Sequence, residues 1–327
     1  SKRADNIIEL FSVDKNQAYS ASIDRLNVSG LLWPDYIVGV IDELIKAGYK
    51  FSGFSAAITG NIPIGAGLSS SAAVECATVF ALNELFRLGI DRMTMVKLAK
   101  KAENNFVGLQ CGIMDMFASM MGKADHAIRL DCRSLDYEYF PLKIAGYKIV
   151  LFDTQVKHSL ASSEYNTRHT ECRAGVQAIQ KKYPAIQSLR DATELMIEET
   201  ITDPTIKKRC LYVVQENNRV IEGCKDLTNG NLYAFGKQMY ASHAGLRDLY
   251  EVSCKELDFI TDKCSKEKDI VGARMMGGGF GGCVIAIIKE DAIESITTRI
   301  SEEYKNSMGR TLKLYITKLN DGTALID

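Results

Sequence analysis

The first part of the chain alternates between short segments with a strand-like pattern and longer stretches with helical periodicity. Apolar and polar residues alternate over residues 6–12 and again over residues 54–59, and polar residues or glycine close each segment. A period of two is typical of a strand with one buried face. Between these segments, residues 36–47 carry apolar side chains at the spacing of one helical stripe, which predicts an amphipathic helix.

Helical periodicity returns after Ser69. The apolar positions keep this period up to Gly89, and glycine is a common residue at the end of a helix. Asp91 can accept a hydrogen bond from the first turn of a further helix over residues 92–105. A third helix is predicted over residues 112–122.

The second half of the chain is dominated by long helical patterns. A short apolar strand over residues 147–152 opens it, and we place a domain boundary at residue 145, which divides the chain into residues 1–145 and 146–327. The remaining elements are predicted helices at 162–182, 205–226, 231–263 and 291–307, and predicted strands at 283–288 and 312–316. Strands and helices interleave without a regular period, which predicts two α+β domains.

Composition supports a folded protein with a small-molecule partner. A length of 327 residues exceeds what one hydrophobic core usually organises, and the chain is 46% hydrophobic and 25% charged. Forty Lys and Arg stand against 41 Asp and Glu. Because there is no basic excess, we expect neither nucleic acid nor a membrane surface as a partner.

The cysteines indicate a reducing compartment. All nine are scattered without a CxxC pair, so neither a zinc site nor a redox motif is predicted. We find neither a signal-peptide pattern nor an apolar run long enough to span a membrane. These observations predict a cytoplasmic protein, and we expect a monomer or a weak oligomer.

Residues 63–73, Pro-Ile-Gly-Ala-Gly-Leu-Ser-Ser-Ser-Ala-Ala, join a predicted strand to a predicted helix and suit an anion. Gly65 and Gly67 allow a tight backbone whose N–H groups point inward, and the helix adds its positive dipole end. A nucleotide triphosphate fits such a loop, and Ser70 or Ser71 could add a hydroxyl ligand to Mg²⁺. The alternative is a turn whose serines only cap the helix. The string is neither a Walker loop nor a dinucleotide fingerprint.

Two acids flank a glycine-containing bend. Glu103 lies late in one predicted helix and Asp115 early in the next, and Gly108 and Gly112 between them let the chain fold back. A helix dipole favours an ionised carboxylate at the position of Asp115, although its neighbours are apolar. Such an acid is either a cap or a functional group, and the residues alone favour the cap.

Residues 274–283, Arg-Met-Met-Gly-Gly-Gly-Phe-Gly-Gly-Cys, form a second glycine-rich segment. By themselves these glycines indicate a backbone that turns sharply or lies close to another segment. The whole segment, however, resembles the third motif of a kinase family that includes galactokinase, homoserine kinase, mevalonate kinase and phosphomevalonate kinase. Residues 63–73 resemble the ATP-binding motif of the same family. Residues 102–115 and 156–168 resemble the galactokinase form of that family, and the likeness runs from about Trp33 to the carboxyl end.

The resemblance implies a fold and a reaction. The fold would pair a ribosomal-protein-S5-like N-terminal domain with a ferredoxin-like C-terminal domain, with the active site between them. The reaction would transfer the γ-phosphoryl group of MgATP to the anomeric hydroxyl of D-galactose. Two alternatives stay open: a kinase for N-acetylgalactosamine, and a sensor of the same fold that binds galactose and ATP without catalysis. An acid retained at Asp115 argues against the sensor.

The resemblance also implies roles for single residues. Asp115 would accept or orient the proton of the sugar hydroxyl, Ser71 and Glu103 would hold Mg²⁺, and the backbone of Gly112 and the side chain of Tyr165 would contact the sugar. The residues that would bind ATP are Trp33, against the adenine, and Gly65, Ala66, Gly67, Leu68, Ser69, Ser70 and Ser71. Without the resemblance, Trp33 would be a core aromatic and Tyr165 an amphipathic residue at a helix start. We assign no chemistry to His158 or to residues 242–253.

One family signature is absent from the sequence. Galactokinases carry an Arg followed by Gly-Glu-His-Thr-Asp-Tyr, which supplies a catalytic Arg and sugar-binding acids, and no segment here matches it. The first residues resemble the portion that follows this signature. We therefore expect that several tens of residues precede Ser1 and that this chain alone is poorly active.

Overall fold

The computed structural model describes residues 1–63, 67–156 and 161–326, apart from the side chains of residues 161–163 and 165. These residues form two compact units. The first holds residues 1–63, 68–139 and 319–326, and the second holds Gly67 and the described part of 140–318. The domain boundary at residue 145 stays a prediction. The division into two units differs from this predicted boundary mainly because residues 319–326, at the carboxyl end, belong to the first unit.

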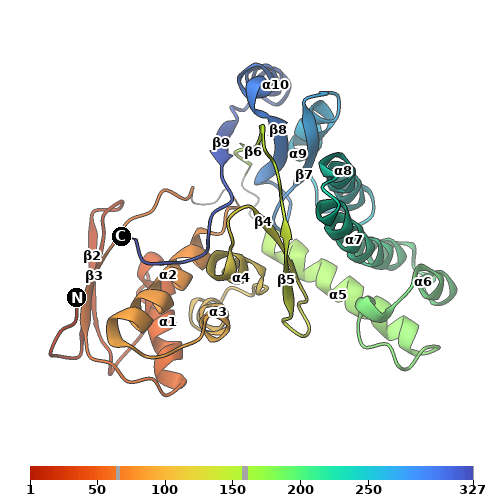
Figure 1. Cartoon of the computed structure of the whole chain (residues 1–327). Coiled ribbons are helices and arrows are strands. Elements are labelled where there is room, and N and C mark those ends of the chain that lie inside the picture. Colours follow the sequence, from red (N-terminus) through yellow and green to blue (C-terminus); the bar gives the residue numbers. More distant parts are fainter. Residues whose placement is uncertain (64–66, 157–160, 327) are drawn as a thin grey trace. The chain divides into compact units, whose positions relative to one another are not determined.

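The first unit packs helices on one face of a three-stranded sheet (Figure 1). Its core joins Ile8 and Leu10 of the central strand to Ile41 and Leu44 of the first helix. In the sheet, β1 (Ile7–Ser12) is antiparallel to β2 (Gln17–Ser22) and parallel to β3 (Phe54–Ile58). The other elements are α1 (Trp33–Lys46), α2 (Ser70–Phe86), α3 (Arg92–Lys101), the π-helix η1 (Ala102–Val107), α4 (Met114–Met121), β4 (His126–Leu130) and β5 (Tyr137–Pro141).

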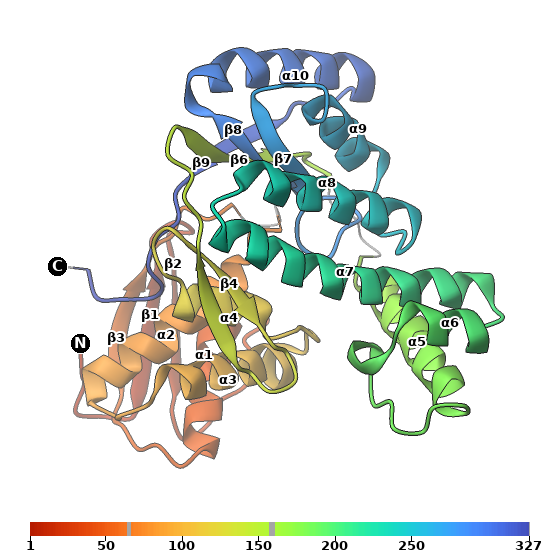
Figure 2. The same ribbon diagram turned by 45° about the vertical axis from the view of Figure 1, so that its right-hand side comes forward.

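The second unit is built on a four-stranded antiparallel sheet with the order β7-β8-β6-β9. Helix α8 lies against β7, α9 lies against β7 and β8, and α7 packs on α8 and α5 (Figure 2). The strands are β6 (Tyr147–Asp153), β7 (Ile270–Met275), β8 (Cys283–Lys289) and β9 (Lys313–Thr317). The helices are α5 (Ala161–Gln180), α6 (Glu194–Thr200), α7 (Pro204–Thr228), α8 (Leu232–Asp248), α9 (Lys255–Cys264) and α10 (Ile293–Met308), with single 3₁₀ turns η2 (Leu189–Asp191) and η3 (Glu290–Ala292).

The predicted elements are mostly present. The helix predicted over residues 36–47 is α1, and Asp91 caps α3 by accepting the N–H of Thr94 at 3.0 Å. Strands β2, β4, β5 and β7 were not predicted from the sequence. In β7 both faces are largely buried, so the alternation that marks a strand with one buried face is missing.

The single helix predicted over residues 231–263 is wrong. Helix α8 ends at Asp248 and α9 begins at Lys255. Two buried arginines bind the carbonyls between them. Arg168 donates to the carbonyls of residues 250 and 251 at 2.7 and 2.8 Å, and Arg209 donates to that of residue 249 at 2.6 Å. Because these arginines come from α5 and α7, the periodicity of residues 231–263 cannot reveal the break.

Helix α8 approaches β7 through a contact between two glycines. A Cβ built on Gly272 would lie 2.6 Å from the Cα of Gly236, and a Cβ on Gly236 would overlap the carbonyl of Val271. We expect Gly236→Ala to lower the free energy of unfolding by about 1–3 kcal/mol, because the helix must move away from the sheet. Urea denaturation of the variant measures this change.

A second helical glycine provides the matched control. In α7, a Cβ on Gly223 would meet the ring of Phe235 at 3.4 Å, which is an ordinary contact. Gly223→Ala should therefore leave stability unchanged or raise it slightly, because alanine favours the helix. Equal losses in the two variants would contradict a special role for the contact between α8 and β7.

In the described part of the chain, no helix is both long enough and apolar enough to cross a lipid bilayer.

Candidate active site

The loop before α2 meets the start of α4 through one hydrogen bond. Ser69 is the N-cap residue of α2, with a left-handed backbone at φ 52°, and its side chain does not cap the helix. Its hydroxyl instead donates to Oδ2 of Asp115 at 2.6 Å. The structure thus brings together the predicted phosphate loop and the predicted acid.

Asp115 is not a helix cap either. Helix α4 has Ile113 as its N-cap residue, without a side-chain cap, and Asp115 lies exposed in the first turn. Helix α4 also contacts α2 through the buried thiol of Cys76, which donates to the carbonyl of Met116 at 3.4 Å. Two contacts therefore place the carboxylate of Asp115 beside Ser69.

Glu103 lies in a buried acidic environment. It is 6% exposed in η1, and it faces Glu75 of α2, which is fully buried. Burial raises the pKa of Glu75 to about 9, and the negative charge of Glu103 adds to this shift. Neither carboxylate oxygen of Glu75 has a hydrogen-bond partner among the residues that the structure describes.

Ser71 lies on the same face of α2 as Glu75. It precedes Glu75 by one helical turn, and residues four apart lie on one face of a helix. The predicted metal ligands Ser71 and Glu103 are thus each related to Glu75: Ser71 is its neighbour on one face of α2, and Glu103 is a nearby negative charge.

The bend between Glu103 and Asp115 is held by local hydrogen bonds. Gly108 has φ 84° and ends η1, and the N–H of residue 109 returns to the carbonyl of Glu103 at 3.0 Å. The side chain of Asn104 accepts the N–H of Cys111 at 3.0 Å. Burial and a hydrogen bond to Glu103 raise the pKa of the Cys111 thiol to about 12. The expected fold-back of the chain is therefore present.

The glycine-rich segment after β7 is both sharply turned and closely packed. Gly279 has φ 89°, and a Cβ there would overlap the carbonyl oxygen of Val252. Gly281 has φ 141°, and a Cβ there would lie 2.5 Å from the carbonyl oxygen of Val156. The sequence indicated that these glycines allow either a sharp turn or a close approach of another segment. The structure shows both features.

The same segment faces the end of the phosphate loop. A Cβ built on Gly67 would lie 3.9 Å from the Cα of Gly282, and one on Gly277 would lie 3.8 Å from the carbonyl oxygen of Gly67. These residues belong to one compact unit. Two motifs that are far apart in the sequence thus lie so close that a single added side-chain carbon would bridge them at van der Waals distance.

The remaining predicted residues have simpler surroundings. Trp33 is the first residue of α1, half-buried against the core, and its Nε1 donates to Gln17 at 2.6 Å. Gly112 is exposed, with open space where a Cβ would stand. Leu68, Ser70 and Ser71 are partly buried around the start of α2. Gly65, Ala66, residues 157–160 and the side chain of Tyr165 lie outside the described residues.

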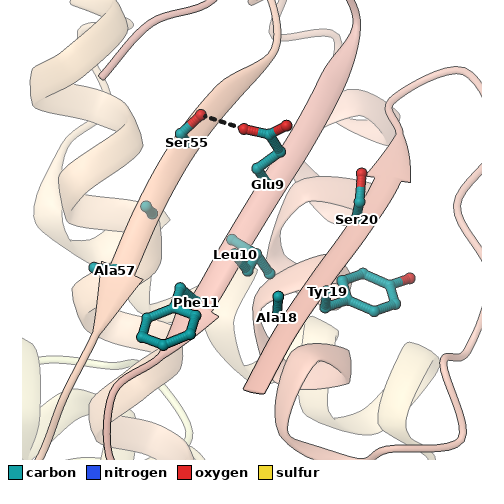
Figure 3. A pocket seen from close by; sticks show the side chains of 9 residues that line it. Glu9, Leu10, Phe11, Ala18, Tyr19, Ser20, Ser55 and Ala57 are labelled. Atoms are coloured by element: carbon teal, nitrogen blue, oxygen red, sulfur yellow. Dashed lines mark hydrogen bonds between the residues drawn. The ribbon is translucent and has the colours of Figure 1, made fainter. Parts of the chain in front are cut away.

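A shallow hollow lies on the sheet of the first unit, on the face opposite Ile8 (Figure 3). Glu9 of β1 accepts the hydroxyl of Ser55 of β3 at 3.0 Å within it. None of the predicted site residues lines this hollow. It is therefore separate from the candidate site around Asp115.

Sequence reasoning missed two residues next to these motifs. Glu75 could have been noticed in the sequence, because it is a charged residue one turn after Ser71 that interrupts the apolar positions of the predicted helix. The sequence contains no indication of a role for His243, because its hydrogen-bond partners Asp258 and Met275 come from other elements.

The oxygen ligands near Ser71 and Glu103 fit a hard cation. Within the described ranges, no group of three or more His, Cys, Asp or Glu is arranged to hold a metal. Mg²⁺ does not need such a group, because it is usually bound by one or two carboxylates together with substrate phosphates and water. The hydroxyl of Ser71 and the buried carboxylate of Glu103 are oxygen ligands of the kind that this mode uses.

Comparison with protein families defines the class. Residues 35–123 match the GHMP kinases N terminal domain, and residues 224–306 match the GHMP kinases C terminal domain. Together these segments cover more than half of the chain. The two-unit architecture is therefore that of a small-molecule kinase of the GHMP class.

Individual relatives narrow this class. Galactokinase of Thermotoga maritima is 43% identical over 323 residues, which cover 99% of this chain and 87% of the relative. Galactokinase of Clostridium acetobutylicum is 41% identical over 329 residues, which cover 96% and 84%. The structure of Lactococcus lactis galactokinase complexed with galactose matches with a TM-score of 0.93 at 36% identity and covers 98% of this chain and 84% of its own. The chain belongs to the galactokinases of the GHMP kinase family.

Proposed function

We infer that the protein is a galactokinase, which transfers the γ-phosphoryl group of ATP to galactose. The finer assignments rest on the geometry of the first unit. The observation that carries them is the 2.6 Å hydrogen bond from Ser69 to Asp115, which joins the phosphate loop to an exposed carboxylate. Phosphoryl transfer needs a positioned nucleophile and charge compensation, and this pairing of a loop with an acid suits both needs.

Asp115 is the residue that addresses the acceptor. Its carboxylate accepts or orients the proton of the anomeric hydroxyl, so that the oxygen is directed at the γ-phosphorus. The backbone of Gly112 and the side chain of Tyr165 contact the sugar. The open space beside Gly112 is consistent with close approach of a ligand to the backbone.

The residues around α2 hold the nucleotide. The loop of Gly65, Ala66, Gly67, Leu68, Ser69, Ser70 and Ser71 surrounds the phosphates, and Trp33 lies against the adenine. Ser71 and Glu103 hold Mg²⁺, which would compensate the phosphate charge when bound. The burial of Glu103 supports this role, because a carboxylate with little access to water gains more from a cation.

A coupled assay of ADP release tests the activity. We expect the protein to release ADP from ATP in proportion to added galactose and to show much lower turnover with N-acetylgalactosamine. Turnover with N-acetylgalactosamine alone would identify the sister kinase. Binding of galactose and ATP by calorimetry without any ADP release would identify a sensor. Either of these results would contradict the proposed activity.

A further inference from the structure

The glycine-rich segment begins at a buried histidine contact. His243 of α8 is 2% exposed, and its Nδ1 accepts the backbone N–H of Met275 at 3.1 Å. Met275 is fully buried and is the last residue of β7, which lies at the edge of its sheet. Buried backbone N–H groups are nearly always paired, and here a side chain serves as the acceptor.

This contact determines the tautomer of the ring. Because Nδ1 accepts the N–H of Met275, the ring hydrogen is on Nε2, which lies 3.1 Å from Oδ1 of Asp258. The hydroxyl of Ser253 donates to the same oxygen at 2.6 Å. A carboxylate that accepts the Nε2 hydrogen keeps Nδ1 free as an acceptor. His243 of α8, Asp258 of α9 and Ser253 between the two helices therefore form one partly buried hydrogen-bond network.

The same part of the chain holds the glycine-rich segment at a second point. The carbonyl of Val252, in the break between α8 and α9, accepts the N–H of Phe280 at 2.7 Å. Between the two anchors, Met275 and Phe280, lies Gly277, where an added Cβ would lie 3.8 Å from the carbonyl oxygen of Gly67. Residues 242–253, to which the sequence analysis assigned no chemistry, thus frame the segment that faces the phosphate loop.

We propose that His243 is a positioning residue for nucleotide binding, because its ring, held by Asp258, anchors the glycine-rich segment beside Gly67. This proposal depends on one part of the proposed function, namely that ATP binds at the phosphate loop. His243 does not touch the nucleotide. It acts through the backbone of Met275, whose position determines how the following glycines meet the loop.

Two substitutions of His243 distinguish the role of its hydrogen-bond acceptor from the role of the space that its side chain fills. His243→Asn keeps an oxygen near the position of Nδ1 and loses the contact with Asp258, and His243→Leu removes both contacts. We expect the Kd of a non-hydrolysable ATP analogue, measured by calorimetry in the full chain, to rise about tenfold in the Leu variant, because a buried N–H loses its partner. The Asn variant should stay within about threefold of the parent. The KM for galactose should not change.

A pair of acids on α9 provides the control. Asp258→Ala should weaken binding of the analogue, because the ring loses the partner that selects its tautomer. Asp262→Ala should not, because Asp262 has an exposed side chain that pairs only loosely with Arg247, at 3.5 Å. Equal affinities in the Asp258 and Asp262 variants, or equally weak binding in both His243 variants, would overturn the proposal.

The tautomer can be measured without any variant. Long-range ¹H–¹⁵N correlation spectra of the parent chain should show His243 with its hydrogen on Nε2 and an unprotonated Nδ1. A ring protonated at Nδ1 would overturn the proposal even if the Leu variant fails to fold. Neither the spectrum nor the binding of the ATP analogue requires galactose. A failure of the proposed activity with galactose is therefore distinguishable from a failure of this inference.

Discussion

Asp115→Asn is expected to lower the kcat of the protein with galactose by about 1,000-fold, within the range typical of a lost proton acceptor. Asparagine keeps the size of the side chain, and its oxygen can still accept the hydroxyl of Ser69, so the loop should keep its geometry. What is lost is a carboxylate that can take or orient the proton of the sugar. Steady-state assays of ADP release measure the effect.

Two measurements show whether this loss is specific. Calorimetric affinity for ATP should change less than about threefold, because in the proposed mechanism Asp115 contacts the acceptor and not the nucleotide. Asp136→Asn removes an exposed carboxylate of the same unit, outside the candidate site, and should leave kcat unchanged. If Asp115→Asn retains more than about a tenth of the parent kcat, Asp115 does not act on the proton.

Glu75→Gln is expected to change how stability depends on pH. The unfolded carboxyl has an ordinary pKa near 4.5 and releases its proton above that pH, whereas the folded side chain keeps it up to about pH 9. The folded state therefore binds more protons between these values, and this group makes the protein less stable as the pH rises. Glutamine is neutral throughout. The variant should gain about 3 kcal/mol over the parent between pH 5 and pH 7.

Denaturation by urea without metal or nucleotide, at pH 5, 6 and 7, tests this expectation. Glu84→Gln is the matched control, because Glu84 lies on the same helix with an exposed side chain that accepts the amide of Asn83 at 2.9 Å. Its difference from the parent in unfolding free energy should stay well below that of Glu75→Gln at pH 7. The free energies of unfolding of the parent and of Glu75→Gln could also differ by the same amount at pH 5, 6 and 7. That result would mean that Glu75 is ionised in the folded state.

Local chemistry explains which predictions from the sequence agree with the structure. The period of apolar residues along α1 and the capping aspartate of α3 act through neighbours in the chain, so both could be predicted directly. The strand β7 and the break after α8 depend on other elements. Carbonyls in that break are bound by Arg168 and Arg209, which lie on other helices. A pattern in one segment contains no information about such partners.

The sequence by itself determined the class of this kinase, because residues 63–73, 102–115 and 274–283 resemble the motifs of a known kinase family at matching places along the chain. Only the tertiary structure decided that Ser69 binds Asp115 instead of capping its helix, and that Glu75 is buried without a partner. The physical reason is that hydrogen-bond partners and burial depend on packing between distant elements. Local composition constrains the backbone but does not select those neighbours.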